Sequence, residues 1–241
     1  MKNINKSKPK NIVDTINRIK LLDYAVFDFD GTIYPNLFLF DLAKKLFVIH
    51  KDKKKLDKLY NIAEKYKNNN FIEAYTEFVE LLKSENKKEL VCLSEELINH
   101  SYKKVKLCIK KLKSKYKLKC YLISITSDFV ANIVKNYFGF DDVIAIQYLT
   151  DHQNRFIGKT IEKIDNPKLM KLRMFEVLFR DNNKRFIYFS DSLDDLLVAR
   201  YASIRVGLNP DKNSLKVINY DIVIKNKDPW GEFYKLMKEP S

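Results

Sequence analysis

Cysteine, histidine, glycine and proline are all scarce in this chain of 241 residues, with three, three, five and six copies. So few glycines and prolines exclude collagen-like and low-complexity structure. The cysteines at positions 92, 108 and 120 form no CxxC pair, and such an odd, scattered set is typical of reduced thiols in a reducing compartment. The histidines are too few and too scattered for a histidine-based zinc site.

Long apolar runs are also missing, because none approaches the ~18 residues that a membrane-spanning helix needs. Residues 1–10 are rich in lysine and asparagine and lack the apolar stretch of a secretory signal. Hydrophobic residues nevertheless make up 46% of the chain, which suffices for a packed core and excludes wholesale disorder. These features predict a soluble cytoplasmic protein.

Acidic residues are outnumbered, with 31 Asp and Glu against 45 Lys and Arg and a net charge of +14. A basic chain suits a nucleic-acid or anionic-membrane partner. The lysines recur along the whole chain, however, and the densest stretch, residues 103–119, places Val105, Ile109 and Leu112 at helical spacing. We interpret this stretch as an amphipathic helix with a solvated basic face. This argues against a nucleic-acid partner and leaves peripheral membrane contact as an alternative.

Short apolar runs that predict buried strands alternate with helical patterns over most of the chain. The predicted strands are residues 24–27, 120–125, 185–190, 204–208 and 221–224, with a further short pair at 143–148 and 154–158. The predicted helices between them are residues 128–137, 167–179 and 193–201. Alternation at this spacing predicts an α/β fold with a doubly wound parallel sheet.

Residues 35–117 interrupt this alternation with helical periodicity alone. Apolar residues recur there at the i, i+3, i+7 spacing of a helix, as at Leu56, Leu59 and Ala63. We therefore expect an all-helical cap domain at 35–117. It is inserted into a Rossmann-like core made of residues 1–34 and 118–241, which opens with a loose tail and a short helix at 12–19.

Polar side chains follow three of the predicted strands. They are Asp28, Asp30, Gly31 and Thr32 after the first strand, Ser124 and Thr126 at the end of the second, and Asp191, Asp194 and Asp195 after a later one. Ligands of an open parallel sheet bind beyond the carboxyl ends of its strands, so we expect these side chains to meet in one crevice. Five carboxylates in so small a volume repel one another unless a cation neutralises them, and oxygen ligands favour Mg²⁺.

The order of these groups resembles the four motifs of the haloacid dehalogenase-like (HAD) hydrolases. The matching positions are Asp28-Phe-Asp30-Gly31-Thr32, Ser124, a lysine near position 168, and the acidic pair Asp191 and Asp195. The later Asn209-Pro210-Asp211 and the helical insertion are similar to the phosphoserine-phosphatase-like branch of that superfamily, subfamily IB. The resemblance spans residues 22–224, nearly the whole chain.

This resemblance implies a phosphoric monoester hydrolase that acts on a small phosphorylated molecule through an aspartyl-phosphate. Asp28 is then the nucleophile and Asp30 the general acid and base. The implied magnesium ligands are Asp28, Asp30 through its backbone carbonyl, and Asp191, with Asp195 supporting the metal's water shell or the lysine. The implied substrate-binding residues are Ser124, Thr126 as an alternative donor, Gly31, Thr32 and Leu37.

Two lysines one helical turn apart compete for the place of the phosphate-binding lysine. Lys168 follows Pro167 in the first turn of a predicted helix, nearer the strand ends, and its spacing to Asp191 is more like that of the family. We therefore favour Lys168 over Lys171.

The resemblance also bears on the substrate. Phosphoserine phosphatases carry a Glu shortly after the first motif and an Arg in a cap helix, and these two would clasp the ammonium and carboxylate of an amino acid. This chain has Leu37 and Phe78 at the matching places, although Phe78 also falls on the apolar stripe of its helix and suits an ordinary core role equally. We expect phosphoserine to be a poor substrate. The alternatives are phosphoserine phosphatase proper, a lipid-phosphate phosphatase, or a basic nucleic-acid-binding protein on the same fold.

Overall fold

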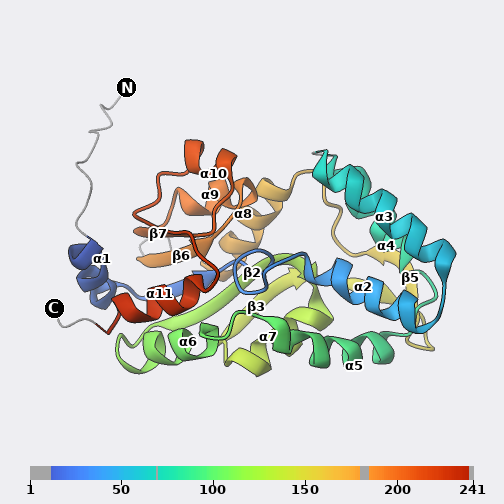
Figure 1. The fold of residues 1–241 in the computed structure, drawn as a ribbon, viewed down its shortest axis with the longest axis horizontal. Helices are drawn as coiled ribbons and strands as arrows, with labels where there is room; N and C mark the ends of the chain where they lie inside the picture. Colours follow the sequence, from blue (N-terminus) through green and yellow to red (C-terminus); the bar gives the residue numbers. More distant parts are fainter. Residues whose placement is uncertain (1–11, 69, 180–184, 239–241) are drawn as a thin grey trace.

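The structure is a computed structural model, which describes residues 12–68, 70–179 and 185–238 (Figure 1). The loose tail that we expect before residue 12 lies outside the described residues. The short helix after it is confirmed as α1 (Ile12–Arg18), which continues into a 3₁₀ turn, Ile19–Leu21. None of the described helices is long and apolar enough to cross a membrane.

A six-stranded sheet forms the centre of the core, and all its strand pairs are parallel. In spatial order its strands are β3 (Asp142–Ile146), β2 (Lys119–Ser127), β1 (Tyr24–Phe27), β6 (Phe186–Ser190), β7 (Ile204–Leu208) and β8 (Ile222–Ile224). The middle strands β1 and β6 are apolar along their length because helices cover both of their faces. The prediction of a doubly wound parallel sheet is confirmed.

Helices lie on both sides of this sheet (Figure 1). One layer holds α6 (Val105–Ser114), α7 (Asp128–Phe138) and α11 (Pro229–Leu236), and the other holds α8 (Pro167–Leu178), α9 (Leu196–Ala199) and α10 (Lys212–Val217). Helix α8 begins as the sequence predicts, with Pro167 in its first turn and the Asn166 side chain accepting hydrogen bonds from two backbone amides. A 3₁₀ turn, Leu193–Asp195, precedes α9.

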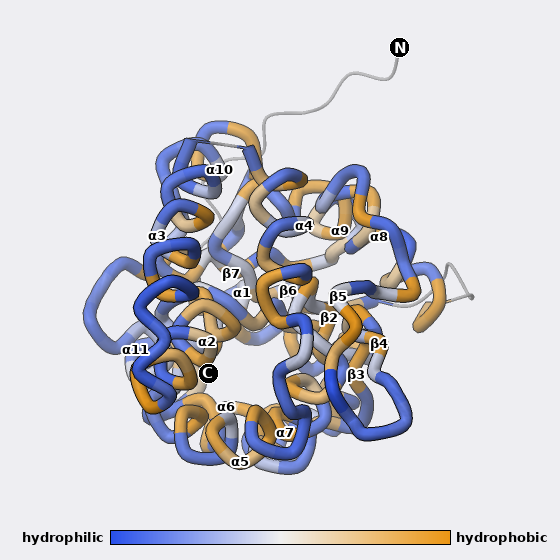
Figure 2. The backbone as a smooth tube through the Cα atoms, turned by 90° about the vertical axis from the view of Figure 1, so that its right-hand side faces the viewer, coloured by the Kyte–Doolittle hydropathy of each residue, from blue (hydrophilic) through white to orange (hydrophobic). Residues whose placement is uncertain are grey.

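The cap helices lie beyond the carboxyl ends of the strands (Figure 1). They are α2 (Phe38–Ile49), α3 (Lys53–Lys67), α4 (Phe71–Leu81) and α5 (Lys87–Leu97), followed by a 3₁₀ turn, Ile98–His100. Helix α2 packs against both α3 and α5, and α3 packs against α4. Because α2 is largely hydrophobic whereas α3 is hydrophilic along most of its length (Figure 2), α2 is the inner helix of the cap.

The cap ends before helix α6, and not at residue 117 as the sequence predicts, because α6 packs on the core. Its buried residues are Val105, Cys108, Ile109 and Leu112. The helix packs on α11, β2 and α7, which are all core elements. The amphipathic pattern is the one that the sequence predicts, but a helical period does not show which domain the apolar face covers.

A two-stranded antiparallel hairpin, β4 (Tyr148–Thr150) and β5 (Phe156–Thr160), packs on cap helix α4. Backbone hydrogen bonds join it to the turn that follows that helix, from Ser84 N to Phe156 O at 2.7 Å and from Phe156 N to Glu85 O at 3.0 Å. The predicted pairing of 143–148 with 154–158 is therefore wrong in its first strand, because residues 142–146 join β2 in the main sheet instead.

Candidate active site

A cavity of about 960 Å³ lies between the carboxyl ends of the strands and the cap. The core supplies Asp28 and Asp30 after β1, Ser124 from β2, and Asp191 after β6. The cap supplies side chains from α2, α3 and α4. The crevice that the sequence predicts is thus present, and the cap closes one side of it.

Asp28 lies at the bottom of this cavity and is buried. Its backbone amide donates to Phe189 O at 3.0 Å, which continues the pairing of β1 with β6 and fixes where the side chain begins. Burial raises the pKa of the Asp28 carboxyl to about 8; repulsion from Asp195 adds to this, and the ammonium of Lys171 opposes it.

The lysine that reaches Asp28 is Lys171. Its Nζ lies 2.7 Å from Asp28 Oδ1 and 2.7 Å from Asp195 Oδ1, and its side chain is buried. Burial by itself lowers the pKa of this ammonium, but the two carboxylates outweigh burial and raise the pKa well above its usual value. The ammonium therefore stays charged beside the carboxyl group of Asp28.

This geometry corrects the choice between the two lysines. Lys168 is only partly buried and lines the cavity wall. Lys171 shares the inner face of α8 with Met170, Met174 and Phe175, which are also buried. The first turn of α8 lies at the cavity wall, and one further turn brings a side chain to the carboxylates. That apolar stripe around Lys171 was the sequence signal that could have decided the choice.

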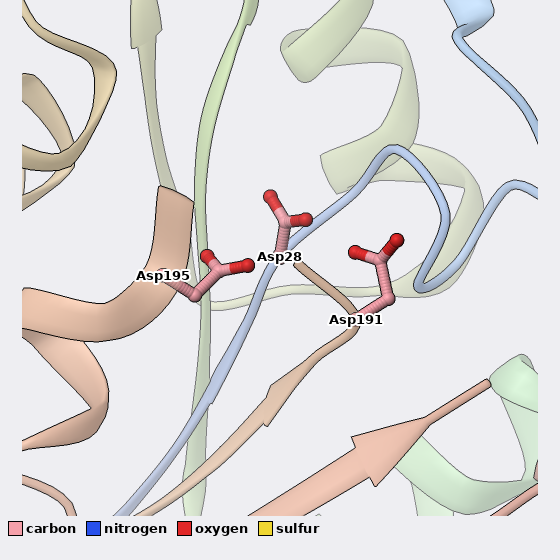
Figure 3. A group of neighbouring side chains, drawn as sticks. All are labelled: Asp28, Asp191 and Asp195. Atoms are coloured by element: carbon pink, nitrogen blue, oxygen red, sulfur yellow. The ribbon is translucent and has the colours of Figure 1, made fainter. Parts of the chain in front are cut away.

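Three carboxylates converge where β1, β6 and the turn after β6 meet (Figure 3). One oxygen from each of Asp28, Asp191 and Asp195 falls within a group no wider than 4.8 Å. Burial raises the pKa of Asp191 well above its usual value, and repulsion from Asp28 adds to this. A divalent cation would relieve this repulsion, so the donor set fits Mg²⁺.

The three carboxylates are not equivalent. Asp195 already accepts hydrogen bonds from Lys171, from the Tyr188 hydroxyl at 2.5 Å and from Ser192 Oγ at 3.3 Å. Asp28 and Asp191 are therefore better placed to bind a cation, and Asp195 holds Lys171 in position. The role of Tyr188 is not predicted from the sequence, because a tyrosine within an apolar strand has the pattern of an ordinary core residue.

Asp30 lies next to the cap. Its Oδ1 accepts a hydrogen bond of 2.7 Å from the backbone amide of Phe38, the first residue of α2. Burial raises the pKa of Asp30 to about 6, and the bond from Phe38 limits the rise. A carboxyl group with this pKa can exchange a proton near neutral pH.

Glycine is required at position 31. Its φ is +77°, and a Cβ there would lie 2.0 Å from Asp191 Oδ2. Thr32 is buried behind the cavity, where its Oγ1 donates to Asp191 Oδ1 at 3.2 Å and its carbonyl accepts from Trp230 Nε1 at 2.7 Å. Gly31 and Thr32 thus determine the position of the Asp191 carboxylate.

Among the other expected substrate-binding residues, Ser124 and Leu37 line the cavity, as does Gly31. The Ser124 hydroxyl oxygen accepts a hydrogen bond of 3.2 Å from the Thr126 amide. The hydroxyl of Thr126 is itself buried, and neither Thr126 nor Thr32 belongs to the cavity wall formed by the described residues. Ser124 is therefore the better placed of the two candidate hydroxyls.

The chain belongs to the family of haloacid dehalogenase-like hydrolases, whose family model matches residues 25–200. The resemblance of its motifs to that family and the prediction of a hydrolase are thereby confirmed. Comparison with curated protein sequences gave no match.

Several solved structures share the fold. A protein of unknown function from Bordetella pertussis Tohama I has a TM-score of 0.72 at 16% identity, covering 85% of this chain and 98% of that one. A substrate-bound phosphoserine phosphatase has a TM-score of 0.67 at 18% identity, covering 90% and 99%. A phosphoserine phosphohydrolase-like protein from Francisella tularensis has 0.68 at 16%, covering 88% and 99%. At these identities the likeness establishes the fold, and it is the fold of phosphoserine phosphatases.

Proposed function

We propose that this hydrolase is a Mg²⁺-dependent phosphatase that cleaves a small phosphate monoester through a phosphorylated Asp28. The observation that carries the proposal is the contact of Asp28 with Lys171 at the bottom of a cavity whose wall also holds Asp30 and Asp191. The fold adds support, because one structure that shares it is described as a phospho-aspartyl intermediate analogue of phosphoserine phosphatase. We also propose that the protein is cytoplasmic, as the sequence predicts.

In the first step an Asp28 oxygen attacks phosphorus, and the bond from phosphorus to the ester oxygen breaks. Asp30 gives its proton to that oxygen, so the alcohol leaves uncharged. In the second step Asp30 takes a proton from water, the water oxygen attacks phosphorus, and the bond to Asp28 breaks. Inorganic phosphate is released, and both carboxylates return to their starting states.

Lys171 and Ser124 are the groups of this chain that bind the phosphoryl oxygens. The lysine contributes a fixed positive charge, already held by Asp195 before substrate arrives, so no reorganisation is needed as charge redistributes. We assign this role to Lys171 and place Lys168 at the cavity wall as an auxiliary positive charge. Asp28, Asp191 and the Asp30 carbonyl would hold Mg²⁺, which when bound supplies a Lewis acid that screens the negative charges of nucleophile and phosphate.

The substrate that we propose is not phosphoserine. Both Leu37 and Phe78 line the cavity, and its wall contains no Glu or Arg among the described residues. An amino acid's ammonium and carboxylate would lose water there without gaining the clasp that the resemblance leads one to expect. Phosphoserine phosphatase proper and a lipid-phosphate phosphatase remain the alternatives to be tested.

The direct test measures hydrolysis of p-nitrophenyl phosphate with Mg²⁺ and with excess chelator. We expect turnover that depends on Mg²⁺ and is abolished in Asp28→Asn, which keeps the shape of the side chain but removes the nucleophile and one negative charge. Asp57→Asn, at an exposed position of α3 outside the cavity, is the matched control and should leave turnover unchanged. Activity of Asp28→Asn within a few-fold of wild type would contradict the proposal.

A further inference from the structure

Five aromatic side chains from three cap helices line the cavity that holds the carboxylates. They are Phe40 on α2, Tyr66 on α3, and Phe71, Tyr75 and Phe78 on α4. Apart from Phe78, which is buried, each is only partly buried. The rings therefore keep surface that the protein itself does not cover.

These rings form one continuous surface, the aromatic wall. Phe40 stacks on Phe78 with ring centroids 4.9 Å apart, and Phe71 stacks on Tyr75 at 5.8 Å. Tyr66 joins the two pairs, at 6.3 Å from Phe40 and 5.6 Å from Phe71. A flat group entering the cavity thus meets ring faces and edges contributed by all three helices, which is the arrangement that favours another aromatic ring.

Charged groups on the cap side of the cavity are few, and each already has a hydrogen-bond or ion-pair partner. Among the described cap residues that line it, these are Asp41 and Lys67. Asp41 accepts hydrogen bonds from the Tyr34 hydroxyl at 2.8 Å and from Asn36 Nδ2 at 3.2 Å. Lys67 Nζ lies 2.6 Å from Glu64 in an exposed pair. The cap therefore offers the leaving group aromatic surface rather than an ionic clasp.

We propose that the leaving group of the substrate is an alcohol that carries an aromatic ring, with the ring packed on the aromatic wall and the phosphoryl group at Asp28. This inference rests on the proposed phosphatase function and specifies its substrate class. The volume of about 960 Å³ lies within the usual range for small-molecule sites and leaves room for a ring beside the phosphoryl group. Because Asp30 protonates the departing oxygen, the alcohol need not be an acidic phenol.

The test compares kcat/KM for benzyl phosphate and ethyl phosphate, two primary alkyl esters, so that the ring is the main difference. We expect benzyl phosphate to be favoured by about tenfold or more, which is the scale of discrimination that one apolar group provides. Cyclohexylmethyl phosphate separates an aromatic preference from a general apolar one, and phosphoserine reports on an ionic clasp. Both should be poorer substrates than benzyl phosphate.

Two tyrosines of α3 provide a matched pair of variants. Tyr66→Leu removes a ring from the aromatic wall and should cut the benzyl-to-ethyl ratio by several-fold. Tyr60→Leu removes an exposed ring outside the cavity and should leave the ratio unchanged. Ethyl phosphate turnover and Tm in both variants report whether the fold and the chemistry are intact.

Each contrary outcome has a distinct meaning. Equal kcat/KM for benzyl and ethyl phosphate, or a ratio unaffected by Tyr66→Leu, overturns the aromatic-wall proposal while leaving the phosphatase in place. Cyclohexylmethyl phosphate or phosphoserine matching benzyl phosphate also overturns it, in favour of a general apolar site or an ionic clasp. No turnover of any of these esters, or of p-nitrophenyl phosphate, with Mg²⁺ contradicts the proposed function itself.

Discussion

The Tyr188 hydroxyl and the Lys171 ammonium share one acceptor, Asp195 Oδ1, at 2.5 Å and 2.7 Å. All three side chains are buried. A hydrogen bond from a neutral hydroxyl to a carboxylate favours the anion, and the anion in turn holds the lysine beside Asp28. Strand β6 therefore contributes to the site through Tyr188, which lies outside the cavity wall.

We predict that Tyr188→Phe lowers kcat while leaving KM nearly unchanged, because it loosens Lys171 without removing it. Loss of one hydrogen bond to a charged group costs about 1.5–3 kcal/mol. The decrease in the free energy of unfolding and the increase in the activation free energy should together not exceed this value. Steady-state kinetics well below Tm separates the two effects. Tyr201→Phe, at an exposed position, is the control. A lower Tm with unchanged kcat would show that Tyr188 is structural only.

Lys171→Ala should reduce kcat/KM far more than Lys168→Ala. Removing a preorganised donor to a developing oxyanion costs about 2.7–4 kcal/mol, or roughly a hundred- to a thousand-fold in rate. Lys168 is partly exposed, so its charge is screened and a change of a few-fold is expected. The same phosphate ester is measured for both variants at saturating Mg²⁺. A larger loss in Lys168→Ala would restore the order of importance that the sequence favours.

Gly31→Ala should weaken Mg²⁺ binding, since its Cβ would lie 2.0 Å from Asp191 Oδ2 and displace that carboxylate. Gly139→Ala is a matched control: its φ is +79°, close to the +77° of Gly31, but a Cβ there meets no atom within 4 Å. Both variants carry the left-handed backbone penalty of about 1–2 kcal/mol. The Mg²⁺ dependence of turnover should shift only in Gly31→Ala, and an equal shift in both would disprove the steric argument.

Mg²⁺ should stabilise the protein more at about pH 8 than at about pH 5, because metal and proton compete for the same carboxylates. The folded-state pKa of Asp28 is raised to about 8, against an unfolded value of about 3.9. The metal-free folded state therefore binds more protons than the unfolded state, and its stability falls as pH rises between these values. Tm measured with and without Mg²⁺ checks this.

The control for this pH experiment is Asp191→Asn, which removes one carboxylate of the cluster. It should reduce the gain in Tm from Mg²⁺ at the higher pH. A gain in wild type that is equal at both pH values, or larger in acid, would show that the cation binds elsewhere.

The features that the sequence predicts correctly are those that depend on local pattern. Apolar runs such as residues 24–27 and 185–190 identify buried strands, and polar groups at their ends identify the crevice, since parallel strands share one carboxyl edge. Asp28, Asp30 and Asp191 meet there because they follow β1 and β6, which are neighbouring parallel strands and end at the same edge of the sheet.

The features that cannot be predicted from the sequence depend on tertiary packing. Helical period shows that α6 is amphipathic but not that its partner is α11. The choice of Lys168 over Lys171 relied on nearness to the start of α8, whereas the structure places Lys171, one turn further along the helix, 2.7 Å from Asp28. The role of Tyr188 cannot be predicted from the sequence, because its contact with Asp195 depends on how β6 and the turn after it are arranged in space.

The central claim, that Asp28 carries the phosphoryl group, is tested most directly by acid-quenching the enzyme during turnover of p-nitrophenyl phosphate and locating the added phosphoryl mass by peptide mass spectrometry. The most informative variant is Asp30→Asn, because p-nitrophenolate leaves without a proton whereas the attacking water still needs a base. The account predicts that phosphate accumulates on Asp28 in Asp30→Asn and is absent in Asp28→Asn. Turnover with no phosphorylated Asp28 in any variant, or phosphate on another residue, would contradict it.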